Sequence, residues 1–292
     1  MANIKIHDDI LGRIKDSVVL ITGGSSGIGR ATAQLCLNLG AAVIVGDLNA
    51  PDPKFENADK FSFLTVNVSD WESLRSMFDH AEQLYGRIDH VFANAGIGPT
   101  TDFLDVTLND NGQLEPPNLR TFNINLLGPI YTTRLAAAYM SELASQRPEG
   151  TGGSIVLAAS ASSFQNFSAG DYTITKHGVL GMIRGMGSKL QQKNIRLNAI
   201  APSWTSTGIV PGGLIQSLGA AVQSPEDVAR SVVLLLADTA RTGEIIYSWE
   251  GNYREVNKSE QGLLASAAAI LENAADEERV MLELRKAQHY HK

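Results

Sequence analysis

A tyrosine and a lysine four positions apart are the side chains in this sequence best suited to moving a proton. Tyr172 and Lys176 lie in the run GDYTITK, which begins at Gly170. Four residues make about one helical turn, so on a helix the phenol and the ammonium share one face. We expect the lysine charge to favour the phenolate and to lower the pKa of Tyr172 towards neutrality. Tyr172 would then serve as a general acid and base at physiological pH.

Two other features give this pair weight. A YxxxK spacing alone arises often by chance, and a solvated helix face explains it equally well. Ser160 lies twelve residues upstream of Tyr172, and a glycine-rich turn follows the first apolar segment of the chain. These features favour a functional site over a solvated face.

The turn TGGSSGIG, residues 22–29, joins a predicted strand to a predicted helix. Glycines at positions 23, 27 and 29 permit a tight turn and close backbone approach to a pyrophosphate. The helix that follows presents free N–H groups and a positive dipole end to such an anion. The spacing is GxxxGxG rather than the GxGxxG of other dinucleotide folds, and a glycine-rich surface turn is the alternative.

Asp47 favours a dinucleotide at this turn. It ends the second predicted strand, about 20 residues beyond the turn, where an acidic side chain can bind the adenosine ribose hydroxyls. Its charge would repel a 2′-phosphate, and the next three residues and Ser26 supply no positive charge. The sequence therefore favours NAD over NADP, with a strand-end aspartate that caps a loop as the alternative.

Short β-branched runs alternate with longer helical patterns along most of the chain. The predicted strands are 18–22, 42–47, 61–66, 88–93, 153–158, 195–199 and 243–247. The predicted helices are 27–39, 71–85, 118–144, 172–192 and one that begins at Ser224. Apolar strands separated by helices imply a parallel sheet covered on both faces. We therefore predict a Rossmann-like, doubly wound α/β fold with a mostly seven-stranded parallel sheet.

Composition narrows the class of protein. The chain has 292 residues and a net charge of −7, which argues against a nucleic-acid partner. Its one cysteine, Cys36, lies in an apolar run and is expected to be a buried, inert thiol in a reducing compartment. No secretory signal or membrane-spanning stretch is visible, so we expect a cytoplasmic protein without a membrane partner.

The two ends fall outside the alternating pattern. Residues 1–16 form a polar lead-in, expected to pack loosely at the sheet edge, and residues 17–251 form one domain that includes the catalytic site. Residues 252–292 are predicted to be a helical C-terminal extension. Its leucines and methionines could pack on the domain, join a second subunit or cover the substrate cleft.

These motifs together resemble the classical short-chain dehydrogenase/reductase family, from about Ser17 to Gly251. The family pattern TGxxxGxG corresponds to residues 22–29, NNAG to residues 93–96, and YxxxK to Tyr172 and Lys176. The resemblance implies a catalytic set of Asn125, Ser160, Tyr172 and Lys176. In that set Ser160 orients the substrate oxygen, Tyr172 transfers the proton and Lys176 holds the nicotinamide ribose. Asn125 marks a helix irregularity that leaves a carbonyl free for a relay water.

The resemblance also implies the cofactor contacts. They are Gly23, Ser25, Ser26, Gly27, Ile28, Gly29, Asp47, Asn67, Val68, Asn94, Ala95, Gly96, Tyr172, Lys176, Pro202, Thr205 and Thr207. Three departures from the family pattern stand out: Ala93 replaces an asparagine, Ser203 replaces a glycine, and Trp249-Glu250-Gly251 replaces Asp-Gly-Gly. The last departure predicts a differently built far edge of the sheet.

The predicted activity is NAD-dependent interconversion of a secondary alcohol and a ketone. Candidate cleft walls contain few charges, which favours a small apolar substrate such as a lipid, steroid, terpenoid or polyketide-like alcohol. Those wall residues are Phe103, Phe164, Phe167, Trp204, Ile209, Val210 and Leu214. The alternatives are an NADPH-dependent biosynthetic ketone reductase and a non-catalytic nucleotide sensor or scaffold. We expect no metal site and, from the family, a homodimer or homotetramer that pairs through the helices at 118–144 and 172–192.

Overall fold

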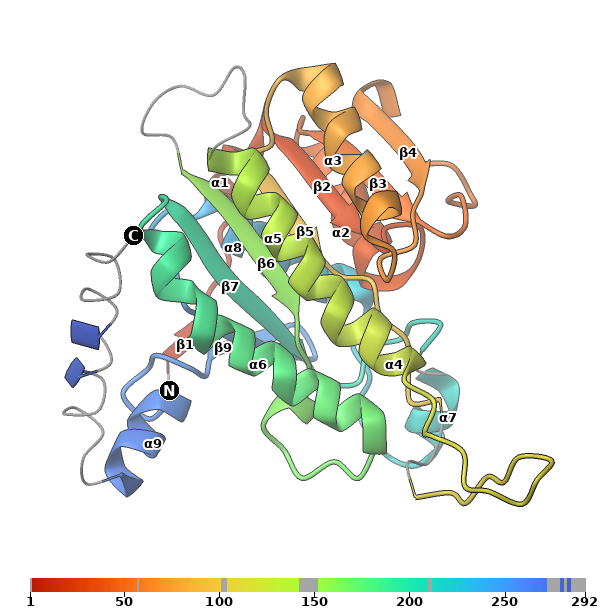
Figure 1. Ribbon diagram of the computed structural model, residues 1–292. Coiled ribbons are helices and arrows are strands. Elements are labelled where there is room, and N and C mark those ends of the chain that lie inside the picture. The colour runs from red at the N-terminus through yellow and green to blue at the C-terminus, as the bar shows by residue number, and fades with distance from the viewer. Residues whose placement is uncertain are drawn as a thin grey trace.

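The computed structural model describes residues 2–56, 58–100, 104–141, 152–209, 212–271, 279–280 and 283–284. These residues form a nine-stranded sheet with helices on both faces (Figure 1). The strand order is β1-β9-β8-β7-β6-β5-β2-β3-β4. Strands β2 to β8 are mutually parallel, so the predicted doubly wound α/β fold with seven parallel strands is confirmed.

The observed elements match most predicted ranges to within a few residues. The strands are β1 (Ala2–Ile4), β2 (Val18–Thr22), β3 (Ala42–Asp47), β4 (Phe61–Thr65), β5 (His90–Ala93), β6 (Gly153–Ala158), β7 (Ile195–Pro202), β8 (Ile245–Trp249) and β9 (Asn252–Glu255). The helices are α1 (Asp8–Leu11), α2 (Gly27–Asn38), α3 (Trp71–Tyr85), α4 (Arg120–Phe122), α5 (Gly128–Ser141), α6 (Gly170–Gln191), α7 (Gly212–Ser217), α8 (Pro225–Ala237) and α9 (Leu263–Ile270). Strand β7 runs further than predicted because β8 pairs with it as far as Pro202.

Each face of the sheet has its own apolar core. Val18 and Leu20 of β2 pack with helices α3, α5 and α6, whereas Val19 and Ile21 pack with α1, α2 and α8. This alternation follows from the two-residue period of a strand. Cys36 of α2 is fully buried in the second core, and burial raises the pKa of its thiol to about 12. The predicted inert thiol is consistent with this position.

The strand order reverses at β2. Strand β3 pairs with one edge of β2 and β5 with the other, so the chain leaves their carboxyl ends in opposite directions. A crevice forms outside the strand ends at such a switch point, and ligands of open α/β sheets bind there. The glycine-rich turn, which follows β2, lies at this position.

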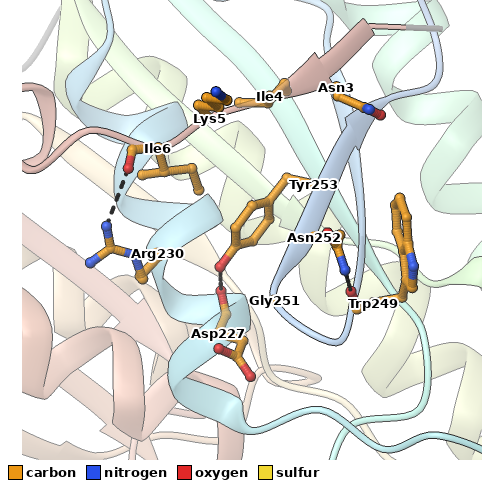
Figure 2. A pocket seen from close by; sticks show the side chains of 10 residues that line it. All are labelled: Asn3, Ile4, Lys5, Ile6, Asp227, Arg230, Trp249, Gly251, Asn252 and Tyr253. Carbon is orange, nitrogen blue, oxygen red and sulfur yellow. Dashed lines mark hydrogen bonds between the residues drawn. The ribbon is translucent and has the colours of Figure 1, made fainter.

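The N-terminal segment is part of the sheet, which corrects the expectation of loose packing. Strand β1 pairs antiparallel with β9, and Leu11 and Ile14 are 1% and 0% exposed. Residues 2–4 and 252–255, assigned from the sequence to the lead-in and the extension, therefore continue the same sheet. A pocket of about 550 Å³ lies between β1, β9 and α8 (Figure 2). There the Tyr253 hydroxyl donates to the Asp227 carbonyl and Arg230 donates to the Ile6 carbonyl.

The far edge of the sheet is built differently from the family pattern, as the Trp249-Glu250-Gly251 departure predicts. Strands β8 and β9 form a hairpin in which Trp249 pairs with Asn252. Both turn residues, Glu250 and Gly251, have positive φ values of 46° and 72°. This conformation is that of a type I′ turn, whose twist matches the twist of the strands that it joins.

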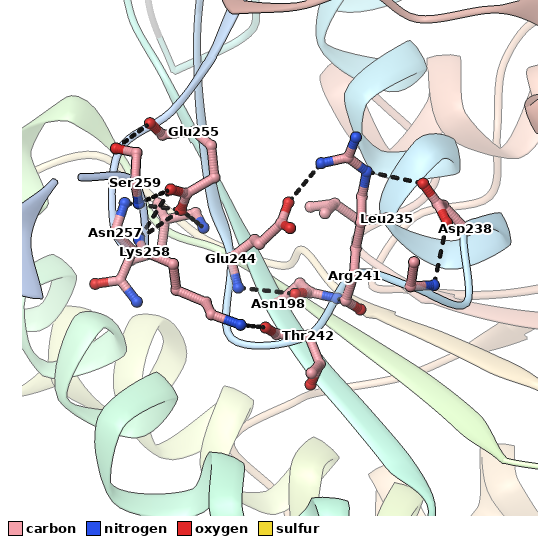
Figure 3. Close-up of polar contacts among 12 residues, drawn as sticks. Asn198, Leu235, Asp238, Arg241, Thr242, Glu244, Glu255, Asn257, Lys258 and Ser259 are labelled. Carbon is pink, nitrogen blue, oxygen red and sulfur yellow. Dashed lines mark hydrogen bonds and ion pairs between the residues drawn. The ribbon is translucent and has the colours of Figure 1, made fainter. Parts of the chain in front are cut away.

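A buried carboxylate fixes the end of this hairpin (Figure 3). Glu255 is 6% exposed, and its two oxygens accept hydrogen bonds from the backbone N–H groups of Ile245, Asn257, Lys258 and Ser259. A buried carboxylate is costly unless it is hydrogen-bonded in this way. The chain is therefore held firmly as far as Ser259.

After Ser259, the main described element of the C-terminal extension is the helix α9, which packs little. Leu263 of α9 contacts the core, whereas Leu264 and Ile270 are 41% and 79% exposed. Leu271 and Leu284 are also exposed, and Met281 and Leu282 lie outside the described residues. Among the described helices, none is both long and apolar enough to cross a bilayer.

Candidate functional site

The glycines after β2 form a cradle that larger residues would fill. Gly23 and Gly27 have φ values of 66° and 52°, in the left-handed region that favours glycine. A Cβ atom on Gly29 would lie 2.2 Å from the Gly23 carbonyl oxygen. The turn therefore exposes backbone N–H groups at the start of α2, which is the geometry that binds a pyrophosphate.

Asp47 lies against this cradle, as the sequence predicts. Its Oδ2 accepts a hydrogen bond of 3.1 Å from the Ser25 backbone N–H, and its Oδ1 accepts one of 3.3 Å from Asn49 N–H. The Ser25 hydroxyl is buried and has no hydrogen-bond partner among the residues that the structure describes. A buried hydroxyl without a partner is costly, so a ligand oxygen at this position would satisfy it. The cradle, the unpaired hydroxyl and the strand-end carboxylate together fit a dinucleotide.

Two further residues of the turn, Ser26 and Ile28, lie at the start of α2. Ser26 is exposed and precedes α2 without capping it, while Ile28 is half-buried within the first helical turn. Neither residue adds a positive charge.

The Asn94 side chain holds the glycine turn. Its amide nitrogen donates to the carbonyls of Thr22 and Gly23, at 3.2 and 2.8 Å. The Thr22 hydroxyl in turn accepts from the backbone N–H groups of Asn94 and Ala95. Gly23 comes so close to Ala95 that a Cβ would lie 2.7 Å from the Ala95 Cα. Sequence reasoning missed the role of Thr22, although it is the first residue of the glycine motif.

Two residues after β4 take different positions. The Asn67 side-chain carbonyl accepts from both the backbone N–H and the hydroxyl of Ser69. The family resemblance implies that Asn67 contacts the cofactor, but these two bonds already use its side-chain acceptor. Val68 is buried, 7% exposed, against Gly128 at the start of α5.

In the segment after β7, one threonine lies at the glycine cradle and another points into the interior of the segment. Pro202 ends β7, and the Thr207 methyl group would lie 3.2 Å from a Cβ on Gly27. Thr205 is 4% exposed; its hydroxyl donates to the Ser203 carbonyl and accepts from Gln223. The structure therefore brings Thr207 to the glycine cradle and turns Thr205 into the loop.

Asn125 lies in an irregular helical segment, as the family resemblance implies. Residues Asn123–Leu127 form a π-helical turn between α4 and α5. Asn125 is 1% exposed, and its amide accepts from the Ile97 N–H and donates to the Ile97 carbonyl, both at 2.8 Å. This reciprocal pair fixes the chain after β5 against the irregular turn. Such π-turns are frequent at functional sites.

Ser160 caps a short helical turn beside the tyrosine. Its Oγ accepts from the Ser162 N–H at 3.1 Å, and the Ser163 hydroxyl accepts from the Ser160 N–H at 3.2 Å. The same Ser160 hydroxyl lies near enough to the Tyr172 phenol to lower its pKa, against the larger effect of burial. Ser160 is therefore fixed from one side and directed towards the phenol from the other. The S-x-S-S pattern at 160–163 is a capping signal that sequence reasoning did not use.

The tyrosine and the lysine share a face of α6, but the expected pKa shift of Tyr172 is wrong in direction. Burial raises the pKa of Tyr172, against a smaller lowering by the nearby Ser160 side chain. Lys176 Nζ lies 5.5 Å from the centre of the tyrosine ring and donates at 2.8 Å to the Ala158 carbonyl. Burial lowers the pKa of Lys176 to about 8. Removal from water therefore disfavours both charged forms, and the spacing argument took no account of it.

Aromatic side chains gather near the ends of β6 and β7. The ring centres of Phe167 and Trp204 are 5.4 Å apart, and Phe164 packs edge-on against Tyr247. Ile209 is 48% exposed. Phe103, Val210 and the side chain of Leu214 lie outside the described residues.

The described residues hold no group of three or more histidines, cysteines or carboxylates placed to bind a metal ion. His289 and His291 lie outside them.

Comparison with known proteins agrees with this architecture. A family model described as short chain dehydrogenase matches residues 17–212. The short-chain dehydrogenase/reductase ascJ of Acremonium egyptiacum is 44% identical over 261 residues, which cover 89% of this chain and 87% of that protein. (+)-Borneol dehydrogenase 1 of Salvia officinalis is 28% identical, with 84% of this chain and 96% of that protein covered. The crystal structure of gox2181 shares the fold, with a TM-score of 0.66 at 24% identity over 83% of this chain and 98% of that one.

Proposed function

The chain belongs to the short-chain dehydrogenase/reductase family, and from this premise we propose that it interconverts a secondary alcohol and a ketone with NAD as cofactor. Family membership makes it an oxidoreductase acting on CH–OH groups. The choice of NAD, the substrate class and the roles of the residues are the proposal. The observation that carries it is the position of buried Lys176, 5.5 Å from the Tyr172 ring, with Ser160 close enough to influence the pKa of that phenol.

The proposed chemistry divides among three side chains. Ser160 binds the substrate oxygen and holds it beside the phenol. Tyr172 removes the alcohol proton during oxidation and returns it during ketone reduction. Lys176 binds the nicotinamide ribose hydroxyls through Nζ. The nicotinamide ring, when bound, supplies hydride exchange with the substrate carbon.

The pKa of Tyr172 bears on the direction of the reaction. Because burial raises it, the phenol is protonated at neutral pH in the cofactor-free protein. A protonated phenol is the acid that ketone reduction needs. Ketone reduction, the reaction of the second candidate, can use this protonated phenol directly as its acid. For oxidation, we propose that positive charge brought beside the ring lowers the pKa of Tyr172.

The residues around the glycine cradle support NAD. The proposed contacts are the backbone of Gly23, Gly27, Ile28 and Gly29, the hydroxyls of Ser25 and Ser26, the Asp47 carboxylate, Val68, the chain at Asn94–Gly96, Pro202 and Thr207. Asp47 is half-buried beside Ser25, so its carboxylate can accept bonds from ribose hydroxyls and would repel a 2′-phosphate.

An apolar substrate is the proposal that fits the walls best. Phe167, Trp204 and Ile209 lie on the two loops after β6 and β7, and Ile209 is exposed. A relative acts, by its name, on borneol, an apolar secondary alcohol. We extend this chemistry to a lipid, steroid, terpenoid or polyketide-like alcohol.

We propose a homodimer or homotetramer that pairs through α6. Gly181 and Gly185 are exposed, and a Cβ on either would have no neighbour within 4 Å among the described residues outside its own helix backbone. Gly178 differs, because a Cβ there would lie 2.8 Å from Leu126. Sedimentation of Gly181→Glu tests this surface: dissociation supports it, and an unchanged oligomer contradicts it. A cytoplasmic location is also part of the proposal.

The decisive experiment compares Tyr172→Phe with the wild type. Purified protein is screened with NAD and NADP against lipophilic secondary alcohols and ketones. We expect Tyr172→Phe to lower turnover by about 100-fold or more, because a general acid–base contributes a factor of this size. Its NAD dissociation constant should stay within about twofold of the wild type.

Tyr131→Phe is the matched control. Tyr131 is half-buried on α5 against Trp71 and should tolerate the change without loss of turnover. Full activity of Tyr172→Phe would show that Tyr172 does not transfer the proton.

A further inference from the structure

Asp171, the residue before the tyrosine, has no role in the chemistry described above. Its side chain is 0% exposed, at the second position of α6. The ion pairs among the described residues do not include it. Burial of a carboxyl group without a neighbouring cation costs free energy, so hydrogen bonds must compensate for the burial of Asp171.

The hydrogen bonds of Asp171 join three segments. Its Oδ1 accepts from the Tyr172 N–H at 2.7 Å, a group that Ala169 O also shares. Its Oδ2 accepts from the Thr100 hydroxyl at 3.3 Å. The Thr100 hydroxyl lies 2.9 Å from that of Thr121. Thr100 has one proton and gives it to Asp171, so Thr121 donates to Thr100.

This chain of donors holds both ends of a projecting segment against α6. Thr100 follows β5 and Thr121 lies in α4; residues 104–119 between them project away from the body (Figure 1, yellow). Leu104 and Val106 in the segment are 88% and 75% exposed. Segments with few packing contacts have low local stability, so the hydrogen bonds at Thr100 and Thr121 are what hold the two ends of this one.

The first turn of α6 depends on those hydrogen bonds on one side. Gly170 enters the helix with a φ of 46°, and Ala169 at the N-cap makes no side-chain cap bond. Thr173 ties the opposite side of the turn to Phe167 and Ser162, in the loop that carries Ser160. Asp171 is thus the link from the backbone of Tyr172 to the segment after β5.

We propose that Asp171 is a positioning residue for Tyr172, which fixes the start of α6 against Thr100 and Thr121 and so holds the phenol at Ser160. The inference rests on the proposed function for its kinetic consequence only. The proposed role is geometric, through the hydrogen bonds of Asp171 to Tyr172 N–H and the Thr100 hydroxyl.

The test uses Asp171→Ala, Asp171→Asn and a matched control in the full chain. An asparagine can accept from Tyr172 N–H and donate to the Thr100 oxygen, so it keeps the links without the charge. Asp171→Ala should lower kcat by about ten- to a hundredfold, because small misplacement of a reacting group is costly. The NAD dissociation constant should stay within about twofold, and Asp171→Asn should recover most of kcat.

Asp227→Ala is the control for general loss of stability. Asp227 holds the start of α8 by accepting from the Ser224 N–H and hydroxyl, away from Tyr172. This variant should lower the melting temperature without lowering kcat.

A second measurement needs no substrate. The ultraviolet titration of Tyr172 is obtained as the difference between each variant and the same variant carrying Tyr172→Phe. In Asp171→Ala the pKa of Tyr172 should fall towards its ordinary value of about 10, because a loosened turn admits water and burial is what raises it. Asp171→Asn should titrate like the wild type.

The outcomes separate the two proposals. Wild-type kcat and wild-type titration in Asp171→Ala would overturn the positioning role. So would an Asp171→Asn variant as impaired as Asp171→Ala. If no alcohol or ketone is turned over but the titration shifts as expected, the proposed function fails and the positioning role stands.

Discussion

At the scale of single residues, removal from water sets the acid–base properties of the candidate site. Tyr172 and Lys176 are both largely buried, and burial moves both of their pKa values towards the neutral forms. In the cofactor-free protein, burial therefore destabilises the charged form of Lys176, whose Nζ donates a hydrogen bond to the Ala158 carbonyl. Its cost to the fold can be measured as a function of pH.

We expect the stability cost of Lys176 to disappear at high pH. The unfolded lysine titrates near 10.5 and the folded one near 8, so between these values the unfolded state binds more protons. Stability therefore rises with pH across this window, and below pH 8 the full penalty of about 3 kcal/mol is present. Urea unfolding without cofactor gives the free energy of unfolding of the wild type and of Lys176→Met. The difference between the two removes the contributions of the other titrating groups. The wild type should gain relative to the variant from pH 8 to 10.5; a flat difference would contradict the assigned pKa.

Cofactor preference should also depend on single residues. Leu48 follows Asp47 and is 58% exposed, so an arginine fits there without repacking. Asp47→Ala combined with Leu48→Arg removes the repulsion of a 2′-phosphate and adds a partner for it. We expect kcat/KM for NADP relative to NAD to rise by about tenfold or more, which corresponds to about 1.4 kcal/mol. Leu48→Arg alone is the control; an equal shift in that variant would remove Asp47 as the determinant.

At the scale of elements, irregular segments between regular ones hold the site together. The π-helical turn at Asn123–Leu127 aims Asn125 at the backbone of Ile97, and Ser160 caps the turn that faces α6. These contacts connect the ends of β5 and β6 to the helices that follow them.

We expect Asn125→Ala to lower the free energy of unfolding by about 2 kcal/mol or more. The change leaves the Ile97 N–H and carbonyl without partners in a water-poor setting, at about 1–3 kcal/mol for each group. Gln34 provides a matched control, because its amide makes the same reciprocal pair with Glu56 at an exposed position. Gln34→Ala should cost less than about 0.5 kcal/mol, since water replaces the lost bonds. Equal urea midpoints for the two variants would contradict the structural role of Asn125.

At the scale of the whole molecule, strands β1 and β9, from opposite ends of the chain, together form one edge of the sheet. Strand β1 covers β9, β9 covers β8, and the residues after β1 reach the core below α8. The lead-in and strand β9 therefore belong to the fold, whereas helix α9 of the extension has no buried residue.

Two substitutions compare these ends directly. Ile14→Ala should cost about 2–5 kcal/mol, because Ile14 is fully buried and its loss leaves a cavity. Leu264→Ala should cost less than about 0.5 kcal/mol, because Leu264 is 41% exposed. Thermal unfolding of both variants checks the comparison; a larger loss for Leu264→Ala would mean that the extension is a structural part of the core.

The sequence by itself determined the order of the elements, the switch point and the residues gathered there. Strand periodicity and turn chemistry are local properties, so β2, the glycine turn and the end of β3 could be predicted from neighbouring residues. The YxxxK spacing likewise placed Tyr172 and Lys176 on one face of α6, where the structure has them.

Only the tertiary structure decided what those residues experience. Burial depends on chain segments far apart in sequence, and it reversed the expected pKa shift of Tyr172. The same long-range packing places residues 2–4 in the sheet as a strand. It also directs the Thr205 hydroxyl into the interior of its own loop. The Asp171 carboxylate accepts a hydrogen bond from the Thr100 hydroxyl, 71 residues away in the sequence. Solvation and contact between distant segments are set by the folded chain, and no local pattern encodes them.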